Sequence, residues 1–592
     1  MLAFPRVNEA ITLGQKQNAA RFVRVRDNQA MSVHSISYAK GPTDQPLLDS
    51  TIGDLLDEIA ARYPDNEALV SVHQGLRYRY REFVDVVDQC ARALLAIGLK
   101  KGDRLGIWSP NYAEWTIVQF ASSKMGAILV NINPSYRLHE LEYALTQSGC
   151  AALVIAEKFK TSDYTQMIRA LAPELCDCTP GALVAERLPS LKTVIRLGAQ
   201  PAAGMWCWND FLNRAGGVSA EILEQAQRQL SPHDPINIQY TSGTTGRPKG
   251  ATLCHHNILN NAHFIAELMN FDHRDRLLIP VPLYHCFGMV IGNLVCVTRG
   301  ATMILPCDAF DPAAVLKAIE DERATALHGV PTMFIAELEH PQFAQYDFSS
   351  LRTGIMAGSP CPVEVMNAVI ARMNLKEIQI AYGMTETSPV STQTRSDAPV
   401  DKRVGTVGQV HPHVEIKIID PESGVTVERG TPGEFCTRGY NVMLGYWNNE
   451  EQTRQAIDAE GWMHTGDLAT LDNEGYARIV GRIKDMIIRG GENVYPREIE
   501  EFLYTNPKVR DVQVIGVPDH KYGEEIMAWV VLRDGVSATE EELKDFCRGR
   551  ISHFKVPRYV RFVTEFPMTV TGKVQKFAMR EQSVRDMEQS NA

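Results

Sequence analysis

The sequence predicts an α/β protein: a large, multi-subdomain N-terminal domain with mainly parallel sheets, followed by a small α+β C-terminal domain. Three observations predict this fold class: the length of the chain, a regular alternation of strand and helix patterns, and a change of texture near Gly481. The chain has 592 residues, more than a single hydrophobic core normally serves, so two or more domains are expected.

The alternation is clearest between residues 104 and 156. Short apolar runs, which are typical of buried strands, alternate there with segments of helical spacing. Such alternation predicts βαβ units with both sheet faces covered, and the same rhythm returns from Leu277 to Gly358. Ligands in such sheets collect at the carboxyl ends of the strands. The segments are, in order, "RLGIWS" (strand), "NYAEWTIVQFASSKMG" (helix), "AILVNIN" (strand), "RLHELEYALTQSG" (helix) and "AALVIA" (strand).

The residue pattern changes at "GRIKDMIIRGGENVYPREIEEFL", where many charged residues and a Gly-Gly pair precede a new predicted helix. The strand-like "DVQVIGVPD" and "EIMAWVVLRDG", the helix "TEEELKDFCRGR" and the strand "YVRFVTEFP" follow. We therefore expect an N-terminal extension over residues 1–40, a large domain over 41–483 and a small domain over 484–592.

Composition narrows the class of protein. Hydrophobic residues make up 44% and charged residues 22%, as in an ordinary globular protein. The net charge of −11, from 60 Lys and Arg against 71 Asp and Glu, argues against a nucleic-acid binder, which would show a basic face. Local positive loops can still bind anions on an acidic protein.

The compartment expected is the cytoplasm, or the mitochondrial matrix if the source is eukaryotic. The first thirty residues lack an apolar signal core, and they read either as a transit peptide or as an over-long start that precedes an initiator at Met31. The 12 cysteines favour reduced thiols in so large a chain. No run reaches 18 uninterrupted apolar residues, and the nearest, Gly288 to Pro306, reads as buried helix and strand.

The segment "YTSGTTGRPKG", Tyr240 to Gly250, has the composition of a phosphate loop. It nearly matches G-x-x-x-x-G-K-[ST], but Pro248 replaces the second glycine and Gly250 replaces the magnesium-binding hydroxyl. Between strand-like "NIQY" and helical "HHNILNNAHFIAELMN" it reads as a strand–loop–helix connection, with the helix N-terminus adding positive potential. His255 and His256 would then cap the helix or lie on the surface. The alternative is a plain flexible loop.

Four further segments complete a recognisable set: "AYGMTET" from Ala381, "WMHTGDLA" from Trp462, "GRIKDMIIRGGENVYPREIE" from Gly481 and "MTVTGKVQK" from Met568. In this order and spacing, from about Leu48 to the C-terminus, the chain resembles the adenylate-forming superfamily. It looks closest to acyl-CoA synthetases that prefer medium-chain fatty acids, on "NPKVRDVQVIGVPD", "ISHFKVPRYV" and "VPLYHCFGM".

The resemblance implies two half-reactions. ATP and a carboxylate first give an acyl-adenylate and pyrophosphate, and the thiol of coenzyme A then displaces AMP. It also implies a mobile C-terminal domain that rotates between the two steps. The substrates are thus a small carboxylic acid, ATP and coenzyme A, with Mg²⁺ as cofactor; the oligomeric state cannot be predicted.

The resemblance also implies a set of nucleotide-binding residues. Glu386 matches the magnesium ligand, Thr385 an α-phosphate contact, and Tyr382 the residue stacked on adenine. Asp467 and Arg482 match the ribose contacts. In isolation, Glu386 could instead cap a helix and Asp467 a turn. The β- and γ-phosphates would be held by Thr241, Ser242, Gly243, Thr244, Thr245, Gly246 and Lys249, and the adenine pocket would be lined by Gly358, Ser359 and Pro360.

The remaining matches concern the acid, the thiol and the domain movement. Lys573 matches the catalytic lysine that screens the approach of the carboxylate to the α-phosphate, and Lys484 matches the hinge. Gly490 and Gly491 match the region that lines the pantetheine tunnel. His285 matches a residue at the mouth of the acyl pocket, although a satisfied structural histidine is the alternative.

The substrate class follows in part from the residues. "VPLYHCFGM" lacks the aspartate with which amino-acid-activating members pair the substrate ammonium, and an unpaired buried ammonium is costly. A fatty or related apolar acid is therefore the first hypothesis. An aryl or other acid, a separate carrier protein as acceptor, and a nucleotide-binding protein without catalysis are the alternatives.

Overall fold

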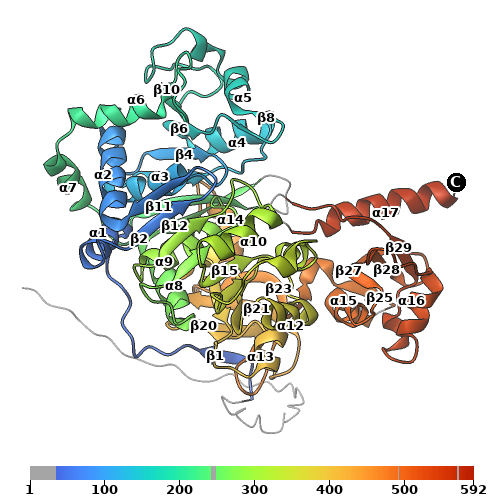
Figure 1. Cartoon of the computed structure of the whole chain (residues 1–592). Helices are drawn as coiled ribbons and strands as arrows, with labels where there is room; N and C mark the ends of the chain where they lie inside the picture. Colours follow the sequence, from blue (N-terminus) through green and yellow to red (C-terminus); the bar gives the residue numbers. More distant parts are fainter. Residues whose placement is uncertain (1–34, 242–247, 491, 570–572, 592) are drawn as a thin grey trace, which may run out of the picture.

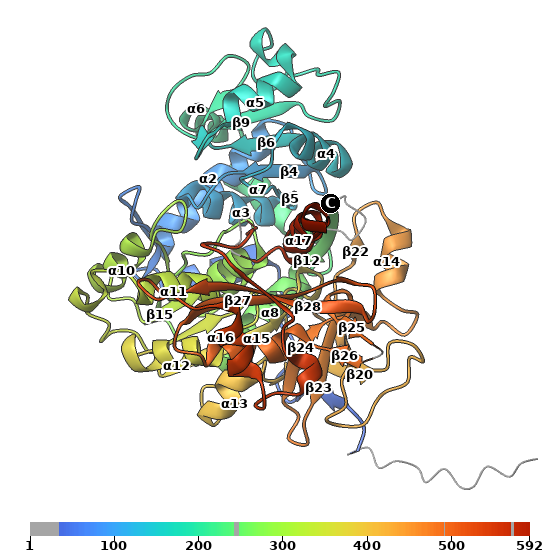
Figure 2. The ribbon, with the colours of Figure 1, turned by 90° about the vertical axis from the view of Figure 1, so that its right-hand side faces the viewer.

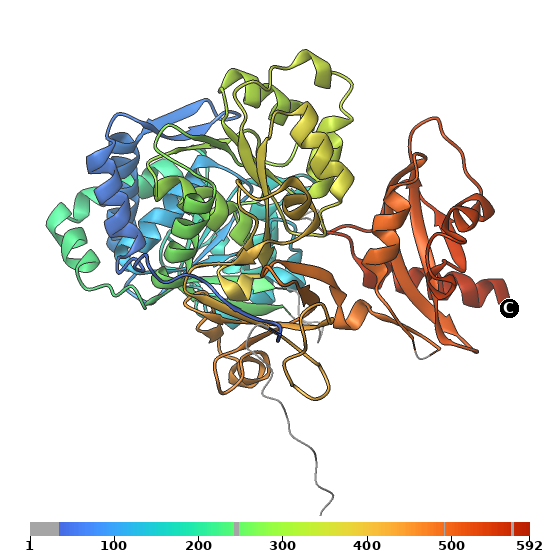
Figure 3. The same ribbon diagram turned by 90° about the horizontal axis from the view of Figure 1, so that it is seen from below.

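The computed structural model describes residues 35–241, 248–490, 492–569 and 573–591. A large N-terminal domain carries a small C-terminal domain at one side (Figures 1 and 3). This confirms the predicted fold class. Among the described residues, no helix combines the length and the apolar character needed to cross a membrane. Met31 and the segment interpreted as a transit peptide lie outside the described residues.

The first large sheet has eight strands, in the order β10-β9-β6-β4-β5-β11-β12-β22. The first six strands in this order, from β10 through to β11, are parallel to one another. β12 then pairs antiparallel with both β11 and β22. β5 and β6 are buried along their whole length, which explains their unbroken apolar runs. The strands are β4 (Arg104–Trp108), β5 (Ile128–Asn131), β6 (Ala152–Ile155), β9 (Thr193–Arg196), β10 (Trp206–Cys207), β11 (Pro235–Thr241), β12 (Lys249–Cys254) and β22 (Gly445–Tyr446).

The second large sheet has nine strands, in the order β19-β18-β17-β16-β15-β13-β14-β2-β3. Its six central strands are parallel. At one end β3 pairs antiparallel with β2, and at the other end β18 pairs antiparallel with both β17 and β19. The strands are β2 (Glu67–Ser71), β3 (Leu76–Arg79), β13 (Arg276–Leu278), β14 (Thr302–Leu305), β15 (Ala326–Gly329), β16 (Thr353–Met356), β17 (Glu377–Gly383), β18 (Val390–Gln393) and β19 (Gln409–Val410).

A third sheet is antiparallel throughout, in the order β1-β20-β21-β23-β24. It was not anticipated from the sequence. β1 falls inside the expected extension over residues 1–40, yet it pairs with β20, so the extension ends before β1 begins. The strands are β1 (Tyr38–Lys40), β20 (Val414–Ile419), β21 (Gly433–Gly439), β23 (Met463–Leu471) and β24 (Ala477–Arg482). A separate two-stranded ribbon joins β7 (Lys158–Phe159) and β8 (Ser162–Asp163).

Helices cover the two large sheets. α1, α2 and α3 pack on one another, and α11 packs against both α10 and α12. The predicted alternation between residues 104 and 156 is confirmed as β4, α3, β5, α4 and β6. The helices are α1 (Ile52–Arg62), α2 (Tyr80–Ala96), α3 (Ala113–Met125), α4 (Leu138–Ser148), α5 (Tyr164–Leu171), α6 (Trp208–Asn213), α7 (Ala220–Gln227), α8 (His255–Leu268), α9 (Val295–Val297), α10 (Pro312–Asp321), α11 (Pro331–Leu338), α12 (Val363–Arg372), α13 (Val400–Gly405) and α14 (Glu450–Ala456).

The small domain is one five-stranded sheet with helices on it (Figure 2). Its path is β26-β25-β28-β27, and β29 pairs in parallel with β28. One apolar cluster contains Ile499 of α15 and Leu543 of α16. Another contains Trp529 of β28 and Met579 of α17. The elements are β25 (Ile487–Arg489), β26 (Glu492–Val494), α15 (Pro496–Tyr504), β27 (Val509–Asp519), β28 (Gly523–Leu532), α16 (Glu540–Cys547), β29 (Tyr559–Phe562) and α17 (Lys576–Asn591).

The phosphate-loop segment differs from its prediction in one respect. β11 is followed by an antiparallel partner, β12, before α8 begins, so the connection is a strand–loop–strand hairpin. The predicted contribution of a helix N-terminus to this loop is therefore wrong. His255 was interpreted as a capping or surface residue; it is fully buried, and its Nδ1 accepts a hydrogen bond from the amide of Ile52, so it caps α1.

Candidate active site

A carboxylate on β23 marks one corner of the site. Asp467 lies directly opposite Arg482 of β24, and its two oxygens accept hydrogen bonds from Arg482 Nε at 3.0 Å and from the hydroxyl of Tyr382 at 2.8 Å. Burial and the charge of Asp467 raise the pKa of Tyr382, whereas the carboxylate raises the pKa of the Arg482 guanidinium. Asp467 thus bonds to side chains of two other strands, unlike a simple turn-capping aspartate.

A second carboxylate lies after β17, in the short 3₁₀ turn η5 (Thr385–Thr387). Glu386 is only 4% exposed, and its Oε1 accepts hydrogen bonds from Thr241 Oγ1 at 3.2 Å and from the hydroxyl of Tyr446 at 2.8 Å. Both donors come from other elements, so Glu386 is not a helix cap. Thr385 is buried beside it.

Tyr446 is a residue that the sequence reasoning missed. The Nζ of Lys249 lies 5.0 Å from the centroid of the Tyr446 ring, a cation–π arrangement, while the Tyr446 hydroxyl donates to Glu386. Tyr446 therefore links the lysine of the phosphate loop to the candidate magnesium ligand. No sequence spacing could have shown this, because the tyrosine lies 60 residues after Glu386.

The loop after β16 forms the third side. Gly358 has φ of +90°, a left-handed conformation that favours glycine, and a Cβ added there would lie 3.8 Å from Cε of Lys573. Ser359 and Pro360 follow it at the carboxyl end of the strand. This is the edge at which parallel sheets collect ligands.

Lys573 reaches this loop from the small domain. Its backbone is fixed by two hydrogen bonds with Thr569: the amide of Thr569 donates to the Lys573 carbonyl at 2.7 Å, and the amide of Lys573 donates to Thr569 Oγ1 at 3.0 Å. Burial, and then the nearby Arg482 charge, lower the pKa of the Lys573 ammonium. Two chain segments distant in sequence therefore meet at this point. Lys573 and Gly358 line a small cavity together with Val281, Pro282, His285, Phe287 and Val330.

His285 faces the same cavity. Burial, and then the charge of Lys573, lower the pKa of its imidazole to about 3, so the ring is neutral at physiological pH. Its Nδ1 accepts a hydrogen bond from the Phe287 amide at 3.2 Å. The ring is thus both a satisfied histidine and a lining residue. It precedes a buried π-helical segment, η3 (Phe287–Leu294), a conformation that is rare and often found at functional sites.

The remaining predicted residues lie elsewhere or outside the described ranges. Lys484 is exposed in η6 (Ile483–Asp485), between the last strand of the large domain and β25. Gly490 directly follows β25 in the small domain, where its amide donates to the Tyr522 carbonyl at 2.8 Å. The residues outside the described ranges are Ser242, Gly243, Thr244, Thr245, Gly246 and Gly491.

Comparison with known proteins shows the family of the chain. The family model described as "AMP-binding enzyme" matches residues 56–447, and the model described as "AMP-binding enzyme C-terminal domain" matches residues 498–573. The chain belongs to the AMP-binding enzyme family. It shares 53% identity with YngI of Bacillus subtilis (strain 168), assigned as an acyl-CoA synthetase, over 91% of this chain and 98% of the relative.

Two further relatives agree. A mitochondrial protein of Macaca fascicularis, the medium-chain acyl-CoA ligase ACSF2, is 46% identical over 96% of this chain and 93% of its own length. The crystal structure of the anthranilate CoA ligase AuaEII with anthranoyl-AMP superposes with a TM-score of 0.80 at 27% identity, covering 92% of this chain and 99% of that one. The chain is an acyl-CoA synthetase, an ATP-dependent ligase of an acid and coenzyme A.

Proposed function

We propose that this acyl-CoA synthetase activates a medium-chain fatty acid through an acyl-adenylate and transfers the acyl group to coenzyme A. The observation that carries the proposal is the position of Lys573, which the small domain delivers to the cavity beside Gly358 and His285. A protein that only binds nucleotide would not need a lysine from a second domain at this place.

In the first half-reaction, an oxygen of the substrate carboxylate attacks the α-phosphorus of ATP. A new P–O bond forms, the bond to the β-phosphate oxygen breaks, and pyrophosphate leaves. Lys573 reduces the repulsion between the two anions, and the hydroxyl of Thr385 contacts the α-phosphate. The positive charge of Lys249 stabilises the departing pyrophosphate. Asp467 accepts hydrogen bonds from the ribose hydroxyls, and Tyr382 stacks on adenine beside the loop of Gly358, Ser359 and Pro360.

The donor set around Glu386 fits Mg²⁺. Its carboxylate and the Thr241 hydroxyl are hard oxygen donors 3.2 Å apart, and Mg²⁺ prefers oxygen ligands. Glu386 would hold the ion, which when bound supplies charge neutralisation at the phosphates. The hydrogen bond from the Tyr446 hydroxyl fixes the position of the Glu386 carboxylate.

In the second half-reaction, the sulfur of coenzyme A attacks the acyl carbon, the bond to the AMP oxygen breaks, and AMP leaves. We propose that the small domain, residues 484–592, first rotates about Lys484 relative to residues 41–483, which removes Lys573 and brings Gly490 and Gly491 to the thiol path. The exposed position of Lys484 between two sheets supports this.

The nature of the acid follows from the cavity. Apart from Lys573 and the neutral His285, its lining consists of Val281, Pro282, Phe287, Val330 and Gly358, with no charged partner for a substrate ammonium among these residues. This favours an apolar acid. Relatives named medium-chain acyl-CoA ligases support an acyl chain of intermediate length. These relatives are mitochondrial, which makes the mitochondrial matrix an alternative to the cytoplasm.

The test is pyrophosphate release with ATP and a panel of acids: butanoate, octanoate, hexadecanoate, a branched acid and benzoate, each with and without coenzyme A. We expect the highest kcat/KM with octanoate, and an acyl-CoA product only when coenzyme A is present. A preference for benzoate would instead support the aryl-acid alternative. No acid-dependent pyrophosphate release from folded protein would refute the enzymatic proposal.

A further inference from the structure

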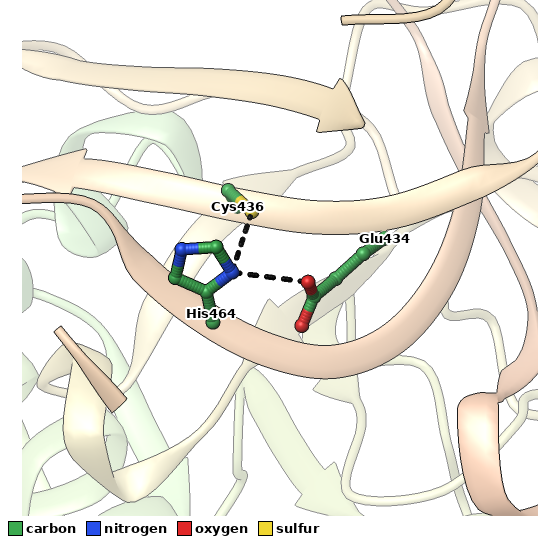
Figure 4. Close-up of side chains that lie close together, drawn as sticks. All are labelled: Glu434, Cys436 and His464. Atoms are coloured by element: carbon green, nitrogen blue, oxygen red, sulfur yellow. Dashed lines mark hydrogen bonds and ion pairs between the residues drawn. The ribbon is translucent and has the colours of Figure 1, made fainter. Parts of the chain in front are cut away.

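Three side chains with metal-binding groups meet on the third sheet (Figure 4). Cys436 of β21 lies directly opposite His464 of β23, and Glu434 lies two residues before the cysteine. The Nδ1 of His464 lies 3.6 Å from Cys436 Sγ and 3.0 Å from Glu434 Oε2. The three donor atoms are all within 4.8 Å of one another.

We propose that Glu434, Cys436 and His464 form a binding site for a divalent transition-metal ion of the Zn²⁺ type. Thiolate, imidazole and carboxylate are the ligands that Zn²⁺ uses, whereas Mg²⁺ and Ca²⁺ select oxygen alone. With tetrahedral angles and usual Zn–S and Zn–N lengths, the sulfur and nitrogen ligands of one ion are separated by about 3.5 Å. The observed separation of 3.6 Å between Cys436 Sγ and His464 Nδ1 agrees with this value.

The surroundings of the three side chains have the features of a metal site. The other ring nitrogen of His464, Nε2, lies 3.5 Å from Asp458 Oδ2, and metal-bound histidines commonly pair their second nitrogen with a carboxylate in this way. Asp458 is itself held, because its Oδ1 accepts the amides of Glu460 and Trp462, each at 2.9 Å. The second oxygen of Glu434 accepts the Gly466 amide at 3.0 Å, which leaves Oε2 directed at His464.

Burial separates the site into an inner and an outer side. Cys436 is fully buried, whereas the side chains of Glu434 and His464 are 12% and 30% exposed. An ion could therefore enter from the side of the histidine, and a water molecule could supply the fourth ligand. Three protein ligands with one open position are typical of a site that exchanges its metal ion or its water, whereas a structural zinc site has four protein ligands.

Protons occupy the same groups when no metal is bound. Hydrogen bonds to Cys436 and Glu434 raise the pKa of His464 to about 10, and burial raises the pKa of the Cys436 thiol. Asp458 adds a negative charge on the far side of the ring, while the charge of Lys417, which lies over the face of Trp462, opposes the rise in the pKa of Cys436. A metal must displace the protons on nitrogen and sulfur, so its affinity rises with pH.

The experiment is a Co²⁺ titration of the full-length protein, followed by the thiolate-to-cobalt absorption band and reversed by Zn²⁺. Cys176 is exposed and Cys178 partly so, and this pair could bind soft metals by itself. The titration therefore uses a C176S/C178S background. We expect one equivalent of Co²⁺ to bind with the charge-transfer band, and tighter binding at pH 8 than at pH 6.

Matched variants assign the ligands. Cys436→Ser, nearly equal in shape, should abolish the band, and Asp458→Asn should weaken binding by about tenfold or more while keeping the band. Cys547→Ser, a buried cysteine of the small domain, is the control and should change neither. If folded protein binds no Co²⁺ at micromolar concentrations, or if Cys436→Ser binds it unchanged, the three residues form only an ion pair beside a buried thiol, and the proposal fails.

Discussion

Replacement of Lys573 by alanine tests the proposed mechanism most directly. The ammonium enters a cavity whose other lining side chains are mostly apolar, so its attraction for an anion is weakly screened. At an effective dielectric constant of about 20, two unit charges about 4 Å apart attract by roughly 4 kcal/mol. Since water partly replaces the lost cation in the variant, we expect a net loss of about 3 kcal/mol, or roughly 100- to 1,000-fold in the adenylation rate.

The assay separates the two half-reactions. Adenylation is followed by pyrophosphate release, and thioester formation is followed by chromatography after the acyl-adenylate and coenzyme A are supplied directly. Lys573→Ala should lose the first activity and keep most of the second, because Lys573 leaves the site in the domain rotation that we propose. The control is Lys508→Ala, which removes a partly exposed lysine paired with Glu542 elsewhere in the small domain.

The pH dependence provides an independent check on the same residue. Burial lowers the pKa of Lys573 below 10.5, and in the proposed mechanism adenylation requires the ammonium form. We therefore expect kcat/KM to be retained below that lowered pKa and lost as the pH rises through it. Lys573→Arg, which stays protonated, should remove this alkaline limb. An equal loss of both half-reactions in folded Lys573→Ala would refute the reasoning.

Three further predictions concern the site and the core. Tyr446→Phe removes the 2.8 Å donor to Glu386 and should lower kcat/KM for pyrophosphate release about tenfold, with unchanged thermal stability as the control. Asp467→Asn removes the charge that Arg482 pairs with and should raise the KM for ATP about tenfold or more with a smaller effect on kcat, measured by initial rates; an unaffected KM would contradict a ribose contact. His328 is fully buried; its Nε2 donates to the Ile291 carbonyl, and its Nδ1 accepts from the Ile355 amide. Burial lowers the pKa of this imidazole to about 4. The protein therefore loses stability as the pH falls from about 6.5 towards 4, because only the unfolded chain takes up the proton. His328→Gln should reduce the loss of unfolding free energy between pH 7 and pH 5 by up to about 2 kcal/mol, measured by urea titration at both values; an unchanged pH dependence would show that this ring is not responsible.

Part of the fold could be predicted because its signals are local. Strands buried on both faces, such as β5 and β6, have unbroken apolar sequences, and helices with one buried face have the matching periodicity. The antiparallel third sheet was not predicted, since β1 and β20 pair across more than 370 residues. β12 was missed between the predicted strand and the predicted helix for a related reason: "KGATLC" contains no alternating pattern, and one of its two partners, β22, lies far along the chain.

The sequence by itself determined the family and the fold class, and it supplied the residues that we propose for nucleotide chemistry, because the motifs that carry them are short and contiguous. Only the tertiary structure decided which of them meet. It placed Lys573 against Gly358, joined Lys249 to Glu386 through Tyr446, and set Cys436 opposite His464. The physical reason is that these contacts depend on strand register and on the docking of the small domain, and neither is encoded in the spacing of residues within one segment.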